Sequence, residues 1–192
     1  MARPREFDPD TVVDAAMNVF WDGGYTATST DDLCEGTGVG RSSLYNTFTS
    51  KRELYGKALR RYGDRTRSAQ AELVERTGPV RPIIRDFLTD ALEAQLADPG
   101  RRGCLALNAA VEVGNSDDDV AALVRDDFET IVETMRALIE RGQRTGEIAA
   151  DRDAHALARL THSALTGIHV VGRVTARREH LTDIVDALVD SL

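Results

Sequence analysis

Apolar residues recur every three or four positions along most of this chain of 192 residues, which is the spacing of an amphipathic helix. We find no convincing strand pattern and no internal repeat, so the predicted fold class is all-α. The stripes predict helices over residues 9–22, 29–37, 40–48, 50–77, 80–96, 104–113, 120 to about 142, 153–173 and 181–192.

The second and third of these helices are short and are separated by a tight turn. Ser29 or Thr30 can cap the first of the pair, and Leu33 is its first buried anchor. Gly38 can adopt the positive φ that the turn needs, and Val39 fills the angle between the two helices. Two short helices joined in this way form the layout of a helix-turn-helix unit, which is typical of DNA-binding proteins.

The second short helix, residues 40–48, turns Leu44 and Phe48 inward at i, i+4 spacing. Lys51 lies at the start of the next helix, where a cation opposes the helix dipole, so a phosphate partner explains it better than helix stability does. The remaining polar side chains can meet phosphates or base edges: Arg41, Ser42, Tyr45, Asn46 and Thr47.

The run from Thr37 to Leu54 resembles the corresponding segment of TetR-family transcriptional regulators. Two departures are Gly40, where the family commonly has a serine that caps the recognition helix, and Ser42, where glycine is common. The first change weakens that cap by a few tenths of a kcal/mol. The expected DNA-binding residues are Ser29, Thr30, Arg41, Ser42, Tyr45, Asn46, Thr47 and Lys51. The best candidates for phosphate contacts are Tyr45, Thr47 and Lys51. The best candidates for base or groove contacts are Arg41, Ser42 and Asn46.

The resemblance implies two functional parts. Residues 1–50 are expected to form the helix-turn-helix DNA-binding domain, the helix over 51–77 connects, and residues 51–192 form an effector-binding and dimerisation domain. The implied function is a homodimeric, ligand-responsive repressor that a small-molecule effector releases from a pseudo-palindromic, double-stranded DNA operator. The sequence identifies neither the operator nor the effector.

The net charge of −8 is unusual for a DNA-binding protein, but its distribution is uneven. Residues 41–62 carry six basic residues and one acidic residue, a net of +5, whereas residues 63–192 carry a net of −7. An acidic remainder favours docking through one face. Arg3 and Arg5 precede the first helix, either as an arm that enters a minor groove or as a solvated tail.

The helix over 153–173 has few charges on either face, since Ser163, Thr166, Gly167 and Val170 lie opposite its apolar stripe. Such a helix should be buried on two sides, one of them against a second copy of the chain. The resemblance likewise implies dimerisation through the last two long helices. The predicted interface is Leu165, Ile168, Leu181, Ile184, Val185 and Leu188.

His155, His162 and His169 repeat every seven residues on the same helix, about 10 Å apart at a rise of 1.5 Å per residue. One metal ion therefore cannot be held by two of them within one helix. A metal site or pH switch across a dimer is open, and ordinary interface histidines are the simpler interpretation. We predict no cofactor and no metal site.

The segment that starts at Gly103 suggests two further hypotheses. Cys104 matches the sensing cysteine of an electrophile-responsive TetR-family repressor, and neighbouring arginines could lower its pKa; alternatively it is a small buried apolar residue. Asn108 and Glu112 share one face of an apolar helix. They either face an effector cavity or pair with a neighbouring helix.

Two other classes of function fit less well. An enzyme needs a nucleophile–base set or a metal cluster, and no local motif supports a thiol hydrolase built on Cys104. A nonspecific nucleic-acid coat protein needs a broad basic surface, which the acidic remainder lacks.

No apolar run reaches the length of a membrane span, no signal peptide is evident, and two distant cysteines argue against a disulfide framework. The expected location is cytoplasmic.

Overall fold

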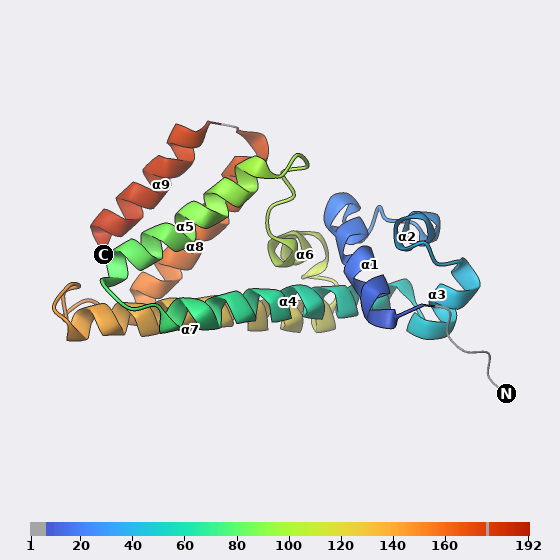
Figure 1. The fold of residues 1–192 in the computed structure, drawn as a ribbon, viewed down its shortest axis with the longest axis horizontal. Coiled ribbons are helices and arrows are strands. Elements are labelled where there is room, and N and C mark those ends of the chain that lie inside the picture. Colours follow the sequence, from blue (N-terminus) through green and yellow to red (C-terminus); the bar gives the residue numbers. More distant parts are fainter. Residues whose placement is uncertain (1–6, 176) are drawn as a thin grey trace. The chain divides into compact units, whose positions relative to one another are not determined.

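The computed structural model describes residues 7–175 and 177–192. Over these residues the chain is helical and contains no strand, which confirms the predicted all-α class. None of the described helices is long and apolar enough to cross a membrane. The helices, labelled in Figure 1, are α1 Pro9–Gly23, α2 Thr30–Thr37, α3 Arg41–Phe48, α4 Lys51–Glu75, α5 Val80–Ala97, α6 Leu105–Val113, α7 Asp118–Arg144, α8 Ala154–Val174 and α9 Arg178–Ser191.

The chain forms two compact units. One, here called the head unit, comprises the described residues up to Arg65 together with Leu105–Arg125. The other, here called the bundle unit, comprises Thr66–Cys104 and Asp126–Leu192. This division differs from the expected boundary at residue 50. The difference arises because α6 and the start of α7 make polar contacts with the helix-turn-helix region, over separations in sequence that no local pattern reveals.

The head unit is built on α1. Asp8 caps this helix by accepting a hydrogen bond from the Asp10 amide, and a proline occupies the first turn, as the sequence predicts. The helix ends at Gly24, whose φ of 76° most residues resist. Phe20 packs edge-on against Tyr55 with ring centroids 4.9 Å apart, which fixes α1 against α4.

In the bundle unit, α5, α8 and α9 pack side by side (Figure 1). Their apolar stripes meet in one continuous core that also takes in α7, as the periodicity predicts. Ile84 of α5 and Ile168 of α8 are fully buried in this core, and so is Leu181 of α9. The helix bounds differ from the predicted ranges by a few residues; α8, for example, begins after Asp153, whose carboxylate caps it.

The predicted dimer interface lies largely within the core of a single chain. Five of its residues are buried there: Leu165, Ile168, Leu181, Val185 and Leu188. Side chains that are buried in this way are not exposed to a second copy. Ile184 packs against the same core but is only partly buried, so it stays a predicted interface residue.

A different face of α8 is exposed in the single chain. Leu160 is 46% exposed, Val170 is 50% exposed and Val174 is 86% exposed, although all three are apolar. Gly167 lies on the same side of the helix, and a Cβ atom placed there would meet nothing within 4 Å. The prediction that α8 has a second apolar side therefore agrees with the structure. The exposed apolar residues on that side are not the ones that were predicted for the dimer interface.

Candidate DNA-binding site

The helix-turn-helix region begins at a well-formed cap. The Ser29 hydroxyl accepts a hydrogen bond from the Asp32 amide, and the Asp32 carboxylate accepts one from the Ser29 amide. These reciprocal bonds satisfy two amides of α2 that would otherwise lack partners, and they lower the pKa of Asp32. Of the two candidate caps, the structure selects Ser29.

The turn between α2 and α3 has the predicted geometry. Gly38 adopts the left-handed conformation, with φ 69° and ψ 13°, and Val39 is buried behind it. α3 starts after Gly40, which provides no side-chain cap, as expected from its lack of a side chain. Leu44 and Phe48 are buried, and this pair fixes which side of α3 faces outward.

Two of the three predicted groove contacts, Ser42 and Asn46, lie on that outward side, and Arg41 occupies the first position of α3. Arg41, Ser42 and Asn46 are all exposed. The Arg41 guanidinium lies 3.1 Å from the Asp31 carboxylate, but both side chains are largely exposed. An ion pair in water contributes little to stability, so Arg41 can exchange Asp31 for another acceptor at small cost.

The predicted phosphate contacts are held more firmly. The hydroxyl oxygens of Tyr45 and Thr30 lie 2.8 Å apart and share a hydrogen bond that links α3 to α2. Thr47 is half-buried at the penultimate position of α3. The bond to Thr30 positions Tyr45 within the head unit, which lowers the entropy that a partner would have to remove on binding.

Lys51 has internal partners that the sequence argument missed. Its ammonium donates to the backbone carbonyls of Tyr25 and Thr28, at 2.7 and 2.8 Å, and lies 4.5 Å from the centre of the Tyr25 ring. The structure therefore explains a cation at this helix start without a phosphate, which corrects the premise of the prediction. Two of its three N–H groups are used in these bonds.

Glu112 of α6 contacts the same loop from another direction. Its carboxylate accepts hydrogen bonds from the backbone amides of Tyr25 and Thr26, at 2.8 and 2.6 Å. Burial raises the pKa of Glu112, but these two bonds outweigh it, so the pKa is lowered overall. Of the two alternatives considered for Glu112, this contact favours pairing within the protein over an effector-facing position, because both carboxylate oxygens bind backbone amides of the head unit.

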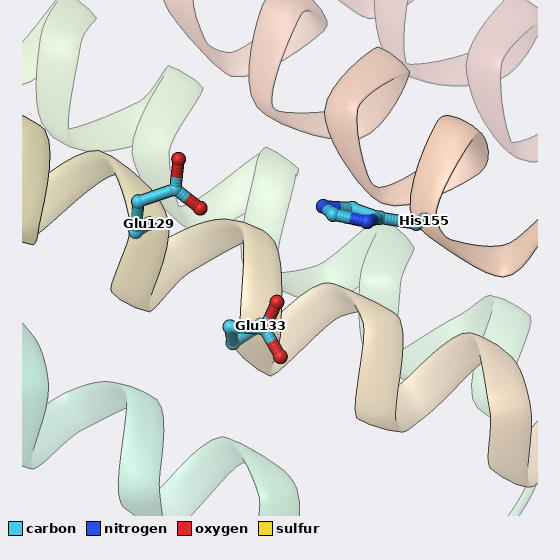
Figure 2. A group of neighbouring side chains, drawn as sticks. All are labelled: Glu129, Glu133 and His155. Carbon is cyan, nitrogen blue, oxygen red and sulfur yellow. The ribbon is translucent and has the colours of Figure 1, made fainter.

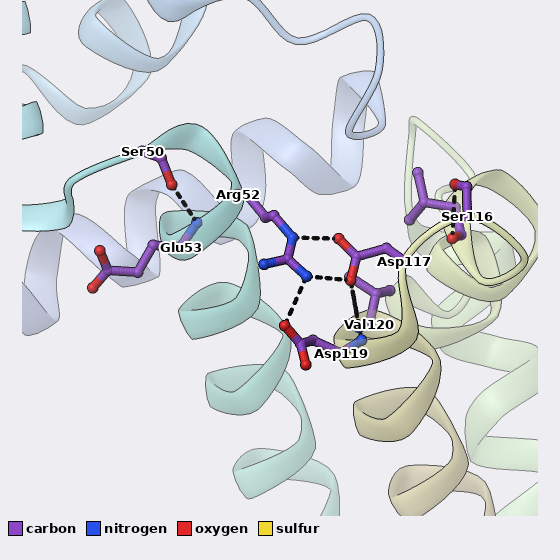
Figure 3. Close-up of polar contacts among 8 residues, drawn as sticks. Ser50, Arg52, Glu53, Ser116, Asp117, Asp119 and Val120 are labelled. Carbon is purple, nitrogen blue, oxygen red and sulfur yellow. Dashed lines mark hydrogen bonds and ion pairs between the residues drawn. The ribbon is translucent and has the colours of Figure 1, made fainter.

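A second link joins the start of α4 to the start of α7 (Figure 3). The Arg52 guanidinium donates to both oxygens of Asp117, at 2.6 and 2.8 Å, and to Asp119 at 2.7 Å. The Arg52 hydrogen bonds lower the pKa of Asp117 to about 2. Asp117 also accepts from the Val120 amide, so one carboxylate both caps α7 and fastens it to α4.

The remaining effector candidates fall in different units. Cys104 is buried and belongs to the bundle unit, whereas Asn108 is half-buried on α6 in the head unit.

The contact between Glu112 and the loop at Tyr25 spans 87 residues of sequence. Helical periodicity carries no information over that distance, so no pattern in the sequence could have predicted this contact.

The three histidines of α8 have different surroundings. The His162 ring packs on Phe128 with centroids 4.7 Å apart, and burial lowers its pKa. His169 is more deeply buried beside Gln95, and burial lowers its pKa to about 4. His155 instead lies near Glu129 and Glu133 of α7. The sevenfold spacing therefore does not correspond to one shared role.

Comparisons with known proteins agree with this geometry. Residues 12–58 match the family described as bacterial regulatory proteins of the tetR family, and residues 81–188 match the tetracyclin repressor-like C-terminal domain. YezE of Bacillus subtilis (strain 168), an uncharacterised HTH-type transcriptional regulator, is 32% identical over 194 residues, which cover 100% of both chains. The HTH-type transcriptional repressor ComR of Escherichia coli (strain K12) is 30% identical, covering 95% of this chain and 87% of ComR.

One solved structure combines the same fold with DNA. It is a cysteine mutant of the TetR-family regulator CifR complexed with 26-bp double-strand operator DNA. This chain matches it with a TM-score of 0.87 and 28% identity, over 99% of each chain. The chain therefore belongs to the TetR family of transcriptional regulators.

The segment at Arg3 and Arg5, for which an arm or a tail was considered, lies outside the described residues.

Proposed function

We propose that this protein is a homodimeric repressor that binds a pseudo-palindromic DNA operator and leaves it when a small-molecule effector binds. The observation that carries the proposal is the outward side of α3. Ser42 and Asn46 are exposed there, opposite the anchors Leu44 and Phe48, and Arg41 is exposed at the first position of the helix. An α-helix with this division fits the width of a major groove and presents donors and acceptors to base edges.

In the proposed complex, Ser29, Thr30, Tyr45 and Thr47 contact phosphates and set the register. Lys51 joins them through the N–H group that its two carbonyl bonds leave available. Backbone contacts of this kind position the protein, while Arg41, Ser42 and Asn46 supply specificity.

A second copy supplies the other half of the operator contact. We assign the dimer interface to the exposed apolar side of α8, with Leu160, Val170 and Val174 around Gly167, in place of the five predicted residues that are buried. Because Gly167 has no side chain, two helices could approach closely there. Two heads related by a twofold axis require two half-sites, which is why we expect a pseudo-palindrome.

The effector has no assigned chemistry. Of the three residues first considered, Asn108 remains a candidate contact because it is half-buried on α6. Cys104 remains the candidate for redox or electrophile sensing, although a side chain that is 8% exposed offers a reagent little access. The contacts of Glu112 and Arg52 are the points through which movement of α6 or α7 would reach the loop before α2 and the start of α4.

The first test is selection of bound duplexes from a random DNA pool at physiological salt. Enrichment of a twofold-symmetric site supports the proposal, and the absence of any enriched sequence contradicts it. Repeating the selection with a mild oxidant, on the wild-type protein and on Cys104→Ser, separates the two modes of release. Loss of binding only in the wild type favours the sensing cysteine over a reversible ligand.

Two substitutions then separate base contacts from phosphate contacts. Arg41→Ala should relax discrimination at particular base pairs by about 1–3 kcal/mol. Lys51→Gln keeps an N–H donor for the carbonyls of Tyr25 and Thr28 but removes the charge. If Lys51 meets a phosphate, this variant should weaken binding on all sequences and reduce the salt slope by about 1. An unchanged slope would leave Lys51 with its internal role alone.

A further inference from the structure

Two glutamates of α7 and one histidine of α8 meet on one side of the bundle unit (Figure 2). Glu129 and Glu133 are four residues apart, so they lie on the same face of α7. The imidazole of His155 projects from the first turn of α8 towards them. One oxygen or nitrogen atom from each side chain lies within 4.8 Å of the other two.

The His155 ring has an unmet need for a partner. Its Nε2 atom is buried, and no hydrogen bond reaches it within the part of the chain that the structure describes. The histidine backbone is meanwhile fixed, because its amide donates to the Asp153 carboxylate at 2.9 Å. Buried ring nitrogens are normally paired, so an unpartnered one in a fixed position requires an explanation.

The two carboxylates lie where a cation could also bind them. Glu129 and Glu133 are both exposed, and like charges at i, i+4 on a helix repel each other. The ion pair of Glu133 with Arg136 offsets part of this repulsion. A cation placed between the carboxylates would offset more of it and would give the imidazole nitrogen its partner.

We propose that Glu129, Glu133 and His155 bind one divalent ion of a first-row transition metal, for which Zn²⁺ is the test ion. Imidazole nitrogen combined with carboxylate oxygen suits such metals, whereas Ca²⁺ and Mg²⁺ prefer oxygen ligands alone. Bonds of about 2.1 Å place two ligands of a tetrahedral ion roughly 3.4 Å apart. Small rotations of two exposed glutamates close the present separation to that value.

Three protein ligands leave at least one coordination position for water or for a further ligand. The ion would connect the middle of α7 to the start of α8, which are joined in the chain only through residues 145–153. This inference goes beyond the proposed function, because it concerns a surface of the bundle unit that contains none of the proposed DNA contacts.

Arg136 competes for one of the ligands. Its guanidinium lies 2.5 Å from one oxygen of Glu133 and 3.9 Å from a Glu140 oxygen. The positive charge of Arg136 opposes a cation nearby, and its ion pair with Glu133 must be shared or broken when the metal binds. Removal of Arg136 should therefore increase metal affinity, which is the opposite of what a structural weakening would cause.

The experiment is a calorimetric titration of the metal-free, full-length protein with Zn²⁺, without DNA. We expect saturation at one ion per chain. His155→Gln and Glu133→Gln should each lower the affinity roughly tenfold or more, and Arg136→Gln should raise it. Parallel titrations with Ca²⁺ and Mg²⁺ should show no saturable binding at the same concentrations.

The matched control is Glu140→Gln. It removes a carboxylate from the same helix that also neighbours Arg136 but lies outside the proposed ligand set. It should not lower Zn²⁺ affinity. Binding that is absent, that exceeds one ion per chain, or that survives His155→Gln would overturn the proposal. Since no step uses DNA, failure here is distinguishable from failure of the proposed regulatory function.

Discussion

The head and bundle units stabilise their helices by different means. α2 and α3 are eight residues long, whereas α5 and α8 have 18 and 21 residues. A helix of eight residues is unstable alone in water, so the short pair depends on its cap, its glycine turn and polar contacts from distant segments. The long helices bury continuous apolar stripes against each other, and polar contacts such as the bonds from the Val80 and Arg81 amides to Glu147 add to this packing.

The two kinds of contact differ in how easily they can be exchanged. Apolar packing over a whole helix length is lost only by large rearrangement, whereas a few charged hydrogen bonds can be exchanged for others. The contacts of Glu112 and Arg52 are of the second kind. In the proposed function, exchange of these two contacts would change the position of the DNA-binding helices.

The largest expected effect is a break in the bundle core. Ile168→Ala should cost about 2–5 kcal/mol of unfolding free energy, since this side chain is fully buried among α5, α8 and α9. Hydrogen exchange followed by mass spectrometry should show faster exchange in these three helices and unchanged exchange in α2 and α3. The control Val111→Ala, at a position 81% exposed, should change stability by less than about 0.5 kcal/mol.

The converse change removes a polar contact of the head unit. Glu112→Gln loses the charge and one of the two acceptor oxygens, so the loop should be destabilised by about 1 kcal/mol. The amides of Tyr25 and Thr26 should then exchange faster, while α5 and α8 stay unaffected. Glu72→Gln, an exposed position on α4, should change neither. If both loop amides exchange as slowly in the variant as in the wild-type protein, the contact does not stabilise the loop.

The link at Asp117 should respond to acid. Its pKa in the folded protein is about 2, below the ordinary value of 3.8, so the carboxylate is stabilised by folding. The stability it contributes is complete above pH 3.8 and is lost as the pH falls towards 2. NMR titration of the Asp117 carboxyl carbon checks this. Arg52→Gln should return the pKa towards 3.8, and an unchanged value would contradict the assigned cause.

The smallest expected effect is a gain in the free energy of unfolding. Gly40→Ser places a capping hydroxyl before α3, where φ is −64° and a Cβ atom would meet nothing within 4 Å. The variant should be more stable by a few tenths of a kcal/mol, because serine satisfies an amide that glycine leaves to water. Slower amide exchange in the first turn of α3 is the expected result, and faster exchange would show that the hydroxyl does not cap.

Much of the local structure could be predicted because its causes are local. The cap at Ser29, the left-handed turn at Gly38 and the buried pair Leu44 and Phe48 all follow from residues within a few positions of each other. The outward side of α3 follows from that pair. Lys51 shows the limit, since its partners lie 23 and 26 residues away, in a loop with no periodic pattern.

The all-α class, the order of the helices and the polar residues that α3 presents follow from the sequence alone, because helical periodicity and capping act over a few residues. The fold of the whole chain decided which apolar face of α8 is buried within the chain and which stays exposed. It also decided that Glu112 binds the loop before α2 and that His155 meets two glutamates. Such choices depend on which helices become neighbours, and a stripe records that a face is buried without recording the partner that buries it.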